Sequence, residues 1–444
     1  IILGTNSIKD TGFDVANSVR FNDGDSPRMH KTPSGAGNRR KFTISAWVKR
    51  GSNLGANSYI FDARVDGSDN APFQFNTSDQ IFFRTKVGGS SYYIQTNRVF
   101  RDVSAFYHLA IVYDNTLGTA GDRIQLWVNG VRETSFADSA MPPQNTDTTV
   151  NNASVVQTVG SEGGGGSFFD GYISEFVLLD GTANSPVDTL GSFDEDSGIW
   201  KPINVSGLTF GTNGFYLDFE DSANLGNDAN GGTDLTEVNL AATDQSTDTC
   251  TNNFCTMNPL DNYYFGGTFS DGNTTVLSKA SGFTYCTSTF GVSAGKWYIE
   301  AKWTSGSYLR FGIVNSPSTA VDDNPGNSAG EAVYRADGAI VLNGTESGGY
   351  GSSFASGDIL SIALDCDNSK IYFAKNGVYQ ASGDPANGTG GTTITNVTTL
   401  PSGNYFFSFG DNDNGATSTM SYNFGNPAFA ISSGNTDGDG YGNF

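Results

Sequence analysis

Short runs in which apolar and polar residues alternate recur along this chain, and each run ends near glycine, asparagine or another turn residue. In residues 42–48, apolar side chains occupy every second position from Phe42 to Val48. Successive side chains of a strand point to opposite faces, so such a run buries one face and leaves the other to water or a covering loop. Many short strands separated by turn signals are typical of a β-sandwich.

Two strands that end in Asn-Gly-Val are the clearest local structures in the sequence. They occupy residues 124–131 and 371–378, and each combines an alternating run with this turn. Asn-Gly between two strands is a strong signal for a two-residue type I′ hairpin, in which both turn residues have positive φ. We therefore expect the same hairpin in both halves of the chain.

The length of 444 residues predicts two domains, because single hydrophobic cores rarely grow beyond roughly 250 residues. The 57 glycines and the low charged fraction of 16% favour strands and turns over helices. We expect an all-β chain of two jelly-roll β-sandwich domains in tandem. The predicted segments are a lead-in at 1–17, a sandwich at 18–221, a linker rich in Asn, Gly and Thr at 222–263, a sandwich at 264–426 and a flexible tail at 427–444.

The net charge of −22 argues against nucleic acid as a partner, because a phosphate backbone would be repelled. The densest basic stretch, residues 28–50, is expected to face acidic neighbours within the protein. No apolar run approaches the roughly 20 residues that span a bilayer, so we expect no membrane insertion.

The four cysteines are too few for a disulfide scaffold and lack the spacing of a zinc site. We predict a local disulfide between Cys250 and Cys255, with reduced thiols as the alternative. Cys286 and Cys366 either pair with each other or lie buried in the second core.

Four segments in the first half follow one another in a recognisable order. They are F-T-I-S-A-W-V at 42–48, Y-H-L-A-I-V-Y-D at 107–114, I-Q-L-W-V-N-G at 124–130 and F-D-G-Y-I-S-E-F at 169–176. This series resembles the laminin-G and concanavalin A-like superfamily. The resemblance covers about residues 18–221 and implies a lectin-like β-sandwich.

The second half contains G-K-W-Y-I-E at 295–300 and G-D-I-L-S-I-A-L-D-C-D-N-S-K-I-Y-F-A-K-N-G at 357–377. This pair of segments resembles SPRY domains, over about residues 264–426. The resemblance implies a β-sandwich that binds partners through its loops.

A laminin-G-like unit followed by a SPRY-like unit in an acidic chain is similar to fibre and structural proteins of tailed phages, particularly marine and cyanobacterial ones. That resemblance implies an extracellular protein on the virion surface. It would bind host glycans or a receptor, or decorate and link other virion proteins, and we expect a homo-oligomer. A secreted or cell-surface bacterial lectin-like adhesin is the alternative.

We predict that the chain is not an enzyme and has no catalytic residue. Its two histidines, His30 and His108, have no nucleophile motif nearby. Glycoside hydrolases of the concanavalin A-like fold carry an E-x-D-x-x-E strand, which is absent from this sequence. A concanavalin A-like glycoside hydrolase is therefore the least favoured alternative.

Glycan recognition needs an aromatic ring to cover a sugar face and fixed polar groups to bind its hydroxyls. Residues 89–93 and 332–338 combine these residue types. Tyr93 and Tyr334 fit equally well as strand residues that fill sandwich edges. The candidate ligand-binding residues are Tyr92, Tyr93, Tyr334, Arg335 and Asp337.

No cofactor is required for these roles. The laminin-G resemblance implies calcium as an optional ligand, bound by loop carboxylates and carbonyls. The candidate ligands are Asp62, Asp114 and Asp122, and acidic turns that are simply solvated are the alternative.

Overall fold

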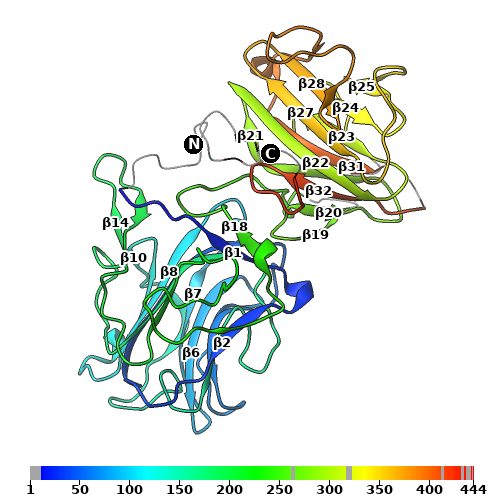
Figure 1. The fold of residues 1–444 in the computed structure, drawn as a ribbon. Helices are drawn as coiled ribbons and strands as arrows, with labels where there is room; N and C mark the ends of the chain where they lie inside the picture. The colour runs from blue at the N-terminus through cyan, green and yellow to red at the C-terminus, as the bar shows by residue number, and fades with distance from the viewer. Residues whose placement is uncertain are drawn as a thin grey trace. The chain divides into compact units, whose positions relative to one another are not determined.

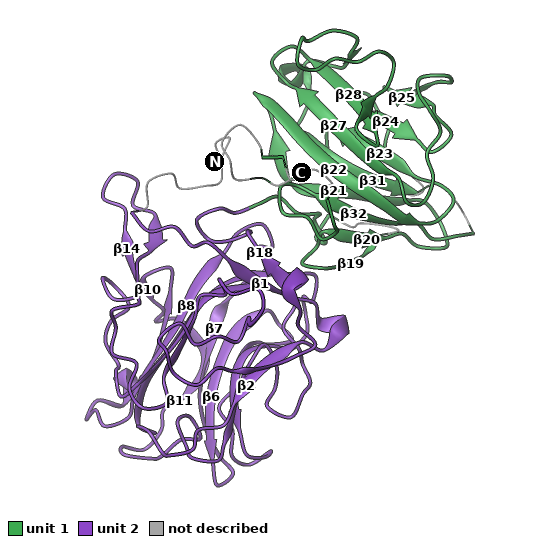
Figure 2. Ribbon diagram, in the orientation of Figure 1, with its two compact units in different colours: residues 1–5, 254–444 green, residues 6–253 purple. Residues whose placement is uncertain are grey.

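The computed structural model describes residues 12–261, 266–316, 323–411, 415–431, 435–436, 442 and 444. The predicted all-β class is confirmed, because strands make up nearly all regular structure (Figure 1). Contacts divide the chain into an N-terminal unit within residues 6–253 and a C-terminal unit within residues 254–444 (Figure 2). The helices of the described residues are short 3₁₀ turns, and none is long and apolar enough to cross a membrane. They are η1 (Asp23–Asp25), η2 (Ala120–Asp122), η3 (Ala242–Asp244) and η4 (Val397–Thr399).

The N-terminal unit is a sandwich of two sheets whose neighbouring strands are antiparallel. In order across the first sheet, the strands are β10 (Val131–Arg132), β9 (Ile124–Val128), β8 (Tyr107–Asp114), β3 (Lys41–Arg50), β13 (Gly171–Asp180), β1 (Ser18–Phe21) and β18 (Gln245–Ser246), and β16 (Phe215–Leu217) also pairs with β13. The second sheet contains β11 (Phe136–Ala140), β7 (Ser90–Val99), β6 (Gln80–Val87), β5 (Phe73–Phe75), β4 (Ser58–Arg64), β12 (Val156–Val159), β2 (Arg28–Lys31) and β17 (Thr236–Val238).

The alternation predicted for residues 42–48 is confirmed, because Phe42, Ile44 and Val48 lie fully buried between the sheets. The opposite face of β3 is covered as well. Trp47 of β3 lies 4.9 Å from the ring of His108 in the neighbouring strand β8. A hairpin of β14 (Gly191–Phe193) and β15 (Trp200–Pro202) covers His108 with the Trp200 ring, 5.6 Å away. Burial lowers the pKa of His108 to about 3, so this histidine is neutral at physiological pH.

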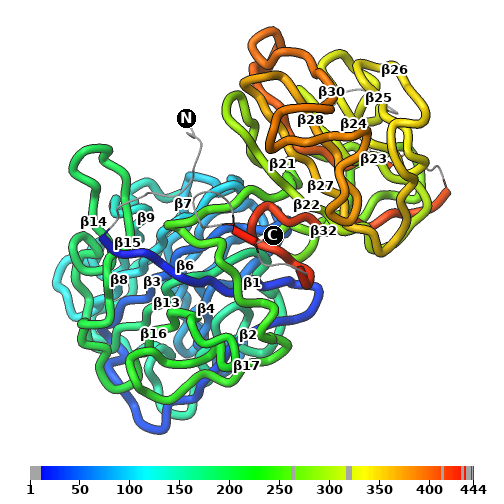
Figure 3. The backbone as a smooth tube through the Cα atoms, turned by 45° about the horizontal axis from the view of Figure 1, so that its top comes forward, coloured from blue at the N-terminus to red at the C-terminus, as the bar shows by residue number. Residues whose placement is uncertain are grey.

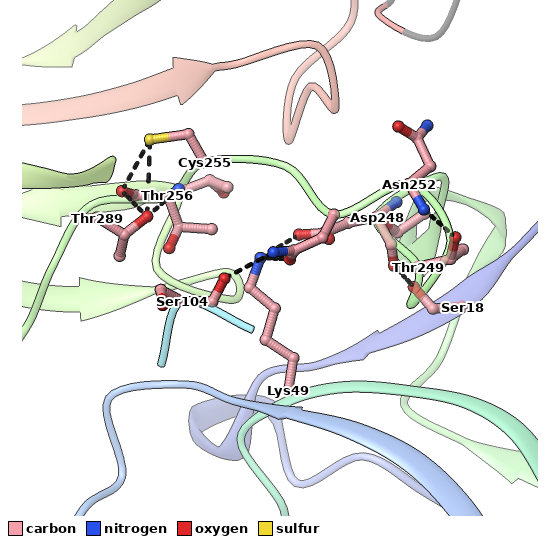
Figure 4. A network of polar contacts seen from close by, with 12 residues as sticks. Ser18, Lys49, Ser104, Asp248, Thr249, Asn252, Cys255, Thr256 and Thr289 are labelled. Carbon is pink, nitrogen blue, oxygen red and sulfur yellow. Dashed lines mark hydrogen bonds and ion pairs between the residues drawn. The ribbon is translucent and has the colours of Figure 1, made fainter. Parts of the chain in front are cut away.

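The sequence predicts a linker at 222–263, but contacts place residues 222–253 of it, here called the closing segment, in the N-terminal unit. Strand β17 pairs with β2, as Figure 3 shows, and β18 pairs with β1. Asp248 forms a buried ion pair with Lys49 of β3, with Nζ 2.8 Å from Oδ2 (Figure 4). The polar residues of the closing segment therefore form an edge strand of each sheet and supply a buried counter-ion for Lys49.

The C-terminal unit also consists of two sheets. One contains β19 (Thr268–Ser270), β20 (Thr275–Leu277), β32 (Thr419–Asn423), β22 (Lys296–Ser305), β27 (Ile359–Asp365), β28 (Lys370–Lys375) and β29 (Val378–Tyr379), and β30 (Thr392–Thr393) also pairs with β28. The other contains β21 (Thr284–Val292), β31 (Tyr405–Asp411), β23 (Arg310–Val314), β24 (Ala332–Arg335), β25 (Ile340–Leu342) and β26 (Thr345–Ser347). Half of the tail predicted at 427–444 lies outside the described residues.

Both predicted Asn-Gly hairpins are confirmed. Asn129 and Asn376 have φ of 48°, and the glycines that follow have φ of 73° and 76°, as a type I′ turn requires. In each unit the Asn side chain also accepts a hydrogen bond from the first residues of the neighbouring strand, from His108 N at 2.7 Å and from Ile359 N at 2.9 Å. The two units therefore use the same turn and the same side-chain bond.

Replacing either turn asparagine with alanine is expected to lower the free energy of unfolding of that unit by about 1 to 3 kcal/mol. Alanine loses the accepted hydrogen bond and tolerates positive φ poorly. Asn129→Gly and Asn376→Gly are the controls, because glycine keeps the backbone conformation and loses only the side-chain bond. Thermal unfolding of all four variants checks this prediction, which fails if the glycine variants lose as much stability as the alanine variants.

The predicted disulfide between Cys250 and Cys255 is wrong, since the structure contains no disulfide at these residues and both are thiols. Burial, together with the nearby Glu175 carboxyl, raises the pKa of the Cys250 thiol. The Cys255 sulfur accepts a hydrogen bond from Thr289, with 3.6 Å between Sγ and Oγ1 (Figure 4). The sulfurs of Cys250 and Cys255 therefore have different surroundings and are not bonded to each other. Cys286 and Cys366 lie buried in the C-terminal core.

Candidate ligand-binding site

Strands β6 and β7 are neighbours in the second sheet of the N-terminal unit (Figure 1). Ile81, Phe83 and Ile94 of these strands point into the core. Alternation therefore places the intervening side chains on the opposite face of the sheet, where they are half-buried. The name β6–β7 face is used here for Phe82, Arg84, Tyr93 and Gln95, together with Asp138 of the neighbouring strand β11.

Strand register brings these side chains together in pairs. Phe82 lies directly opposite Gln95, and Arg84 lies opposite Tyr93. The rings of Phe82 and Tyr93 are 5.8 Å apart between centroids and tilted by 36°, and the Arg84 guanidinium lies 5.9 Å from the Phe82 ring centre. Two half-exposed rings and a cation therefore share one small area of the sheet.

Fixed polar groups surround the two rings. The Tyr93 hydroxyl donates to Asp138 Oδ2 at 2.8 Å, and this hydrogen bond raises the pKa of Tyr93. Gln95 Nε2 donates to Gln80 Oε1 at 2.7 Å. Arg84 Nη2 donates to Asn70 Oδ1 at 2.6 Å. These bonds hold the carboxylate, amide and guanidinium groups in set positions beside the rings.

Two buried polar atoms at this face have no hydrogen-bond partner among the described residues. They are Oε1 of Gln74, which lies opposite Phe82 in the neighbouring strand β5, and Nε of Arg84. Buried polar groups are nearly always paired, with protein or with ordered water. Both atoms lie buried beneath the face, so they are not counted among its ligand-binding groups.

The structure separates the tyrosines that the sequence placed side by side. Tyr93 belongs to the β6–β7 face. Tyr92 lies opposite Thr85, a buried residue, and so belongs to the other face of the same strands. Of this pair, only Tyr93 therefore remains a candidate ligand contact.

The predicted ligand residues of the C-terminal unit differ in their environments. Tyr334 is a core residue, with its ring 4.9 Å from that of Phe354, so its assignment as a ligand contact is corrected to packing. Arg335 forms ion pairs with Asp337 and with Glu346. The two predicted polar residues thus bind each other at the turn that follows β24.

The three predicted calcium ligands do not meet. Among the described residues, no group of three or more His, Cys, Asp or Glu side chains is placed to hold a metal ion. Each carboxylate instead has a cationic neighbour: Asp62 pairs with Arg64 at 2.8 Å, Asp114 with Lys41 at 3.6 Å and Asp122 with Arg132 at 2.7 Å.

Sequence reasoning missed Phe82, Arg84, Gln95 and Asp138. The alternation of residues 81–84 contained a signal, since it places Phe82 and Arg84 on one face. The strand partner of β6 and the register between them decide which polar groups surround those rings, and local sequence does not specify that register.

Comparison with known proteins matches residues 24–186 to the family model described as the concanavalin A-like lectin/glucanases superfamily. A curated relative, the dual specificity protein kinase splA of Dictyostelium discoideum, is 34% identical over 84 residues, which cover 18% of this chain and 3% of that protein. The chain therefore spans only a small part of this relative.

Two solved structures are also similar. A human SPRY domain has a TM-score of 0.26 and 20% identity, and the match covers 36% of this chain and 94% of that one. Domain 4 of AbnA, a GH43 extracellular arabinanase from Geobacillus stearothermophilus in complex with arabinotriose, has a TM-score of 0.27 and 18% identity, over 34% of this chain and 66% of that one. The match to the family model over residues 24–186, together with the two-sheet sandwich, identifies the fold of the N-terminal unit as concanavalin A-like.

Proposed function

We propose that the N-terminal unit binds a glycan on the β6–β7 face and performs no catalysis. The observation that carries this proposal is the adjacency of the Phe82 and Tyr93 rings, with the Arg84 guanidinium beside them. Aromatic rings cover the apolar face of a sugar, and fixed polar groups around them bind its hydroxyls. The superfamily match supports this chemistry, since the superfamily includes lectins.

The proposed setting is extracellular, on the surface of a phage particle, where the protein would attach to host glycans or link other virion proteins as a homo-oligomer. The order of the two units and the net charge of −22 support this setting. A bacterial lectin-like adhesin would use the same face. Mass spectrometry of purified particles distinguishes the two, because only a virion protein remains with the particles in a fixed ratio.

Replacing Tyr93 with alanine is expected to weaken glycan binding about tenfold, because a ring contact and its ordered hydroxyl contribute roughly 1 to 1.5 kcal/mol. Glycan-array screening of the whole chain identifies the ligand, and titration calorimetry measures the loss. Tyr92→Ala is the matched control, since Tyr92 lies next in sequence but on the other face, and it should bind as the unaltered protein does.

Equal losses from the Tyr92 and Tyr93 variants would exclude the β6–β7 face as the binding site. Turnover of any arrayed polysaccharide would contradict the non-catalytic assignment. Thermal unfolding of both variants verifies that each remains folded at the assay temperature.

A further inference from the structure

A second polar site lies where β3 begins and β13 ends. The side chains and backbone of residues 36–40, with Asp147, Asp180, Gly211 and Thr212, line an open hollow of about 670 Å³. This volume falls within the roughly 300 to 1,000 Å³ of small-ligand sites. None of the residues of the β6–β7 face lines the hollow.

The Asp180 carboxylate lines the hollow and is held in place by hydrogen bonds. Its Oδ1 accepts hydrogen bonds from Asn38 N at 2.6 Å and Asn151 Nδ2 at 3.1 Å, and its Oδ2 accepts one from Asn213 N at 3.0 Å. Gly37 permits this close approach, because a Cβ there would lie 2.0 Å from Asp180 Oδ2. The Asp180 carboxylate is thus already satisfied by protein donors.

The two arginines of the hollow retain unused donors. Arg40 Nε donates to Asp147 Oδ1 at 2.6 Å, and Arg39 Nε donates to Thr148 O at 2.7 Å. Arg39 Nη1 lies 3.8 Å from Asp147 Oδ2. Both terminal nitrogens of Arg40 and Nη2 of Arg39 have no hydrogen-bond partner among the described residues. Asp147, with 44% of its side chain exposed, is the carboxylate that competes for them.

We propose that this hollow binds the carboxylate of an acidic saccharide. A guanidinium group presents paired N–H donors in a planar fork that matches a carboxylate. The guanidinium groups of Arg39 and Arg40 both lie beside one exposed carboxylate, that of Asp147. Asn38 and Thr212 line the same hollow and supply polar groups for neighbouring sugar hydroxyls. The site differs from the β6–β7 face in residues and in ligand chemistry, so the two proposals stand independently.

Titration calorimetry of the whole chain with trigalacturonate, its methyl ester and acetate tests the proposal. Trigalacturonate should bind at least tenfold more tightly than the methyl ester, which has the same sugars without the charge. Acetate at the same concentration should not compete. Arg40→Ala should weaken trigalacturonate binding at least tenfold, whereas Tyr93→Ala should leave it unchanged.

Asp147→Asn makes the prediction specific, because it removes the competing carboxylate and should strengthen trigalacturonate binding severalfold. Such a gain could not result from misfolding, because a misfolded variant would lose affinity for trigalacturonate. Arg132→Ala is the matched control, because Arg132 also forms an exposed ion pair, with Asp122, and does not line the hollow.

Equal binding of the acid and its ester, equal competition by acetate, or full affinity in Arg40→Ala would each overturn the acidic-saccharide site. None of these outcomes affects the glycan proposal for the β6–β7 face, which depends on Tyr93.

Discussion

Replacing Asp248 with alanine is expected to lower the free energy of unfolding of the N-terminal unit by about 3 to 5 kcal/mol, because it leaves the buried ammonium of Lys49 without its counter-ion. Lys49 Nζ lies 2.8 Å from Asp248 Oδ2 and 2.8 Å from Asn253 Oδ1. Its charge also faces the rings of Phe106 and Tyr172, at 5.8 and 5.5 Å. The amide of Asn253 and the two rings cannot replace a full negative charge.

Hydrogen–deuterium exchange of the whole chain checks this result, since it reports the stability of each unit separately. Asp122→Ala is the control, because its ion pair with Arg132 is exposed and should contribute no more than about 1 kcal/mol. Lys49→Met combined with Asp248→Leu should recover most of the loss, because no charge then remains buried. A loss below about 1 kcal/mol in Asp248→Ala would show that the pair does not hold the closing segment.

The same ion pair predicts where the N-terminal unit ends. A fragment that stops at residue 221 lacks β17, β18 and Asp248, and should not fold cooperatively, whereas a fragment that stops at residue 253 should. A cooperative thermal transition in the shorter fragment would contradict this boundary.

The stability of the N-terminal unit is expected to fall between about pH 4.5 and pH 8 because of Glu175. This residue is buried at a β-bulge of β13, with φ of 50°, and its Oε2 accepts the Tyr216 hydroxyl at 2.7 Å. Burial raises the pKa of Glu175 to about 8, and the carboxylates of Asp218 and Glu220 add to the shift. The folded protein thus keeps a proton that the unfolded chain, with a pKa near 4.5, releases.

The sign follows from proton linkage. Below pH 4.5 both states are protonated, and the contribution to stability is fully present. Between the two pKa values the folded state holds more protons, so stability falls by up to about 1.4 kcal/mol per pH unit. Above pH 8 both states are ionised and the fall ends.

Chemical denaturation at pH 5.5 and pH 7.5 measures this effect in the unaltered protein and in Glu175→Gln. The stability of the unaltered protein relative to the variant should decrease by about 2.5 kcal/mol across this interval. The variant corrects for Asp170, whose burial raises its pKa to about 6 and adds a pH dependence of its own. A stability difference that is the same at both pH values would contradict the assignment to Glu175.

Features with a local cause were predictable from the sequence. The strands follow from alternation, and the two type I′ hairpins follow from Asn-Gly. The excess of acidic residues predicted that the basic stretch at residues 28–50 faces carboxylates. Two of its lysines do so, since Lys41 pairs with Asp114 and Lys49 pairs with Asp248. Each of these features depends on neighbours in sequence or on average composition.

The closing segment and the two candidate sites depend on contacts between distant residues. Asp248 is 199 positions from Lys49, and Asn213 is 33 positions from Asp180. Tyr93 and Tyr334 were equivalent in sequence, yet one lies on a half-exposed face and the other in a core. The sequence by itself determined the strands, the turns and the all-β class. Only tertiary structure decided which side chains meet, because strand order and register place distant residues side by side and local sequence does not encode either.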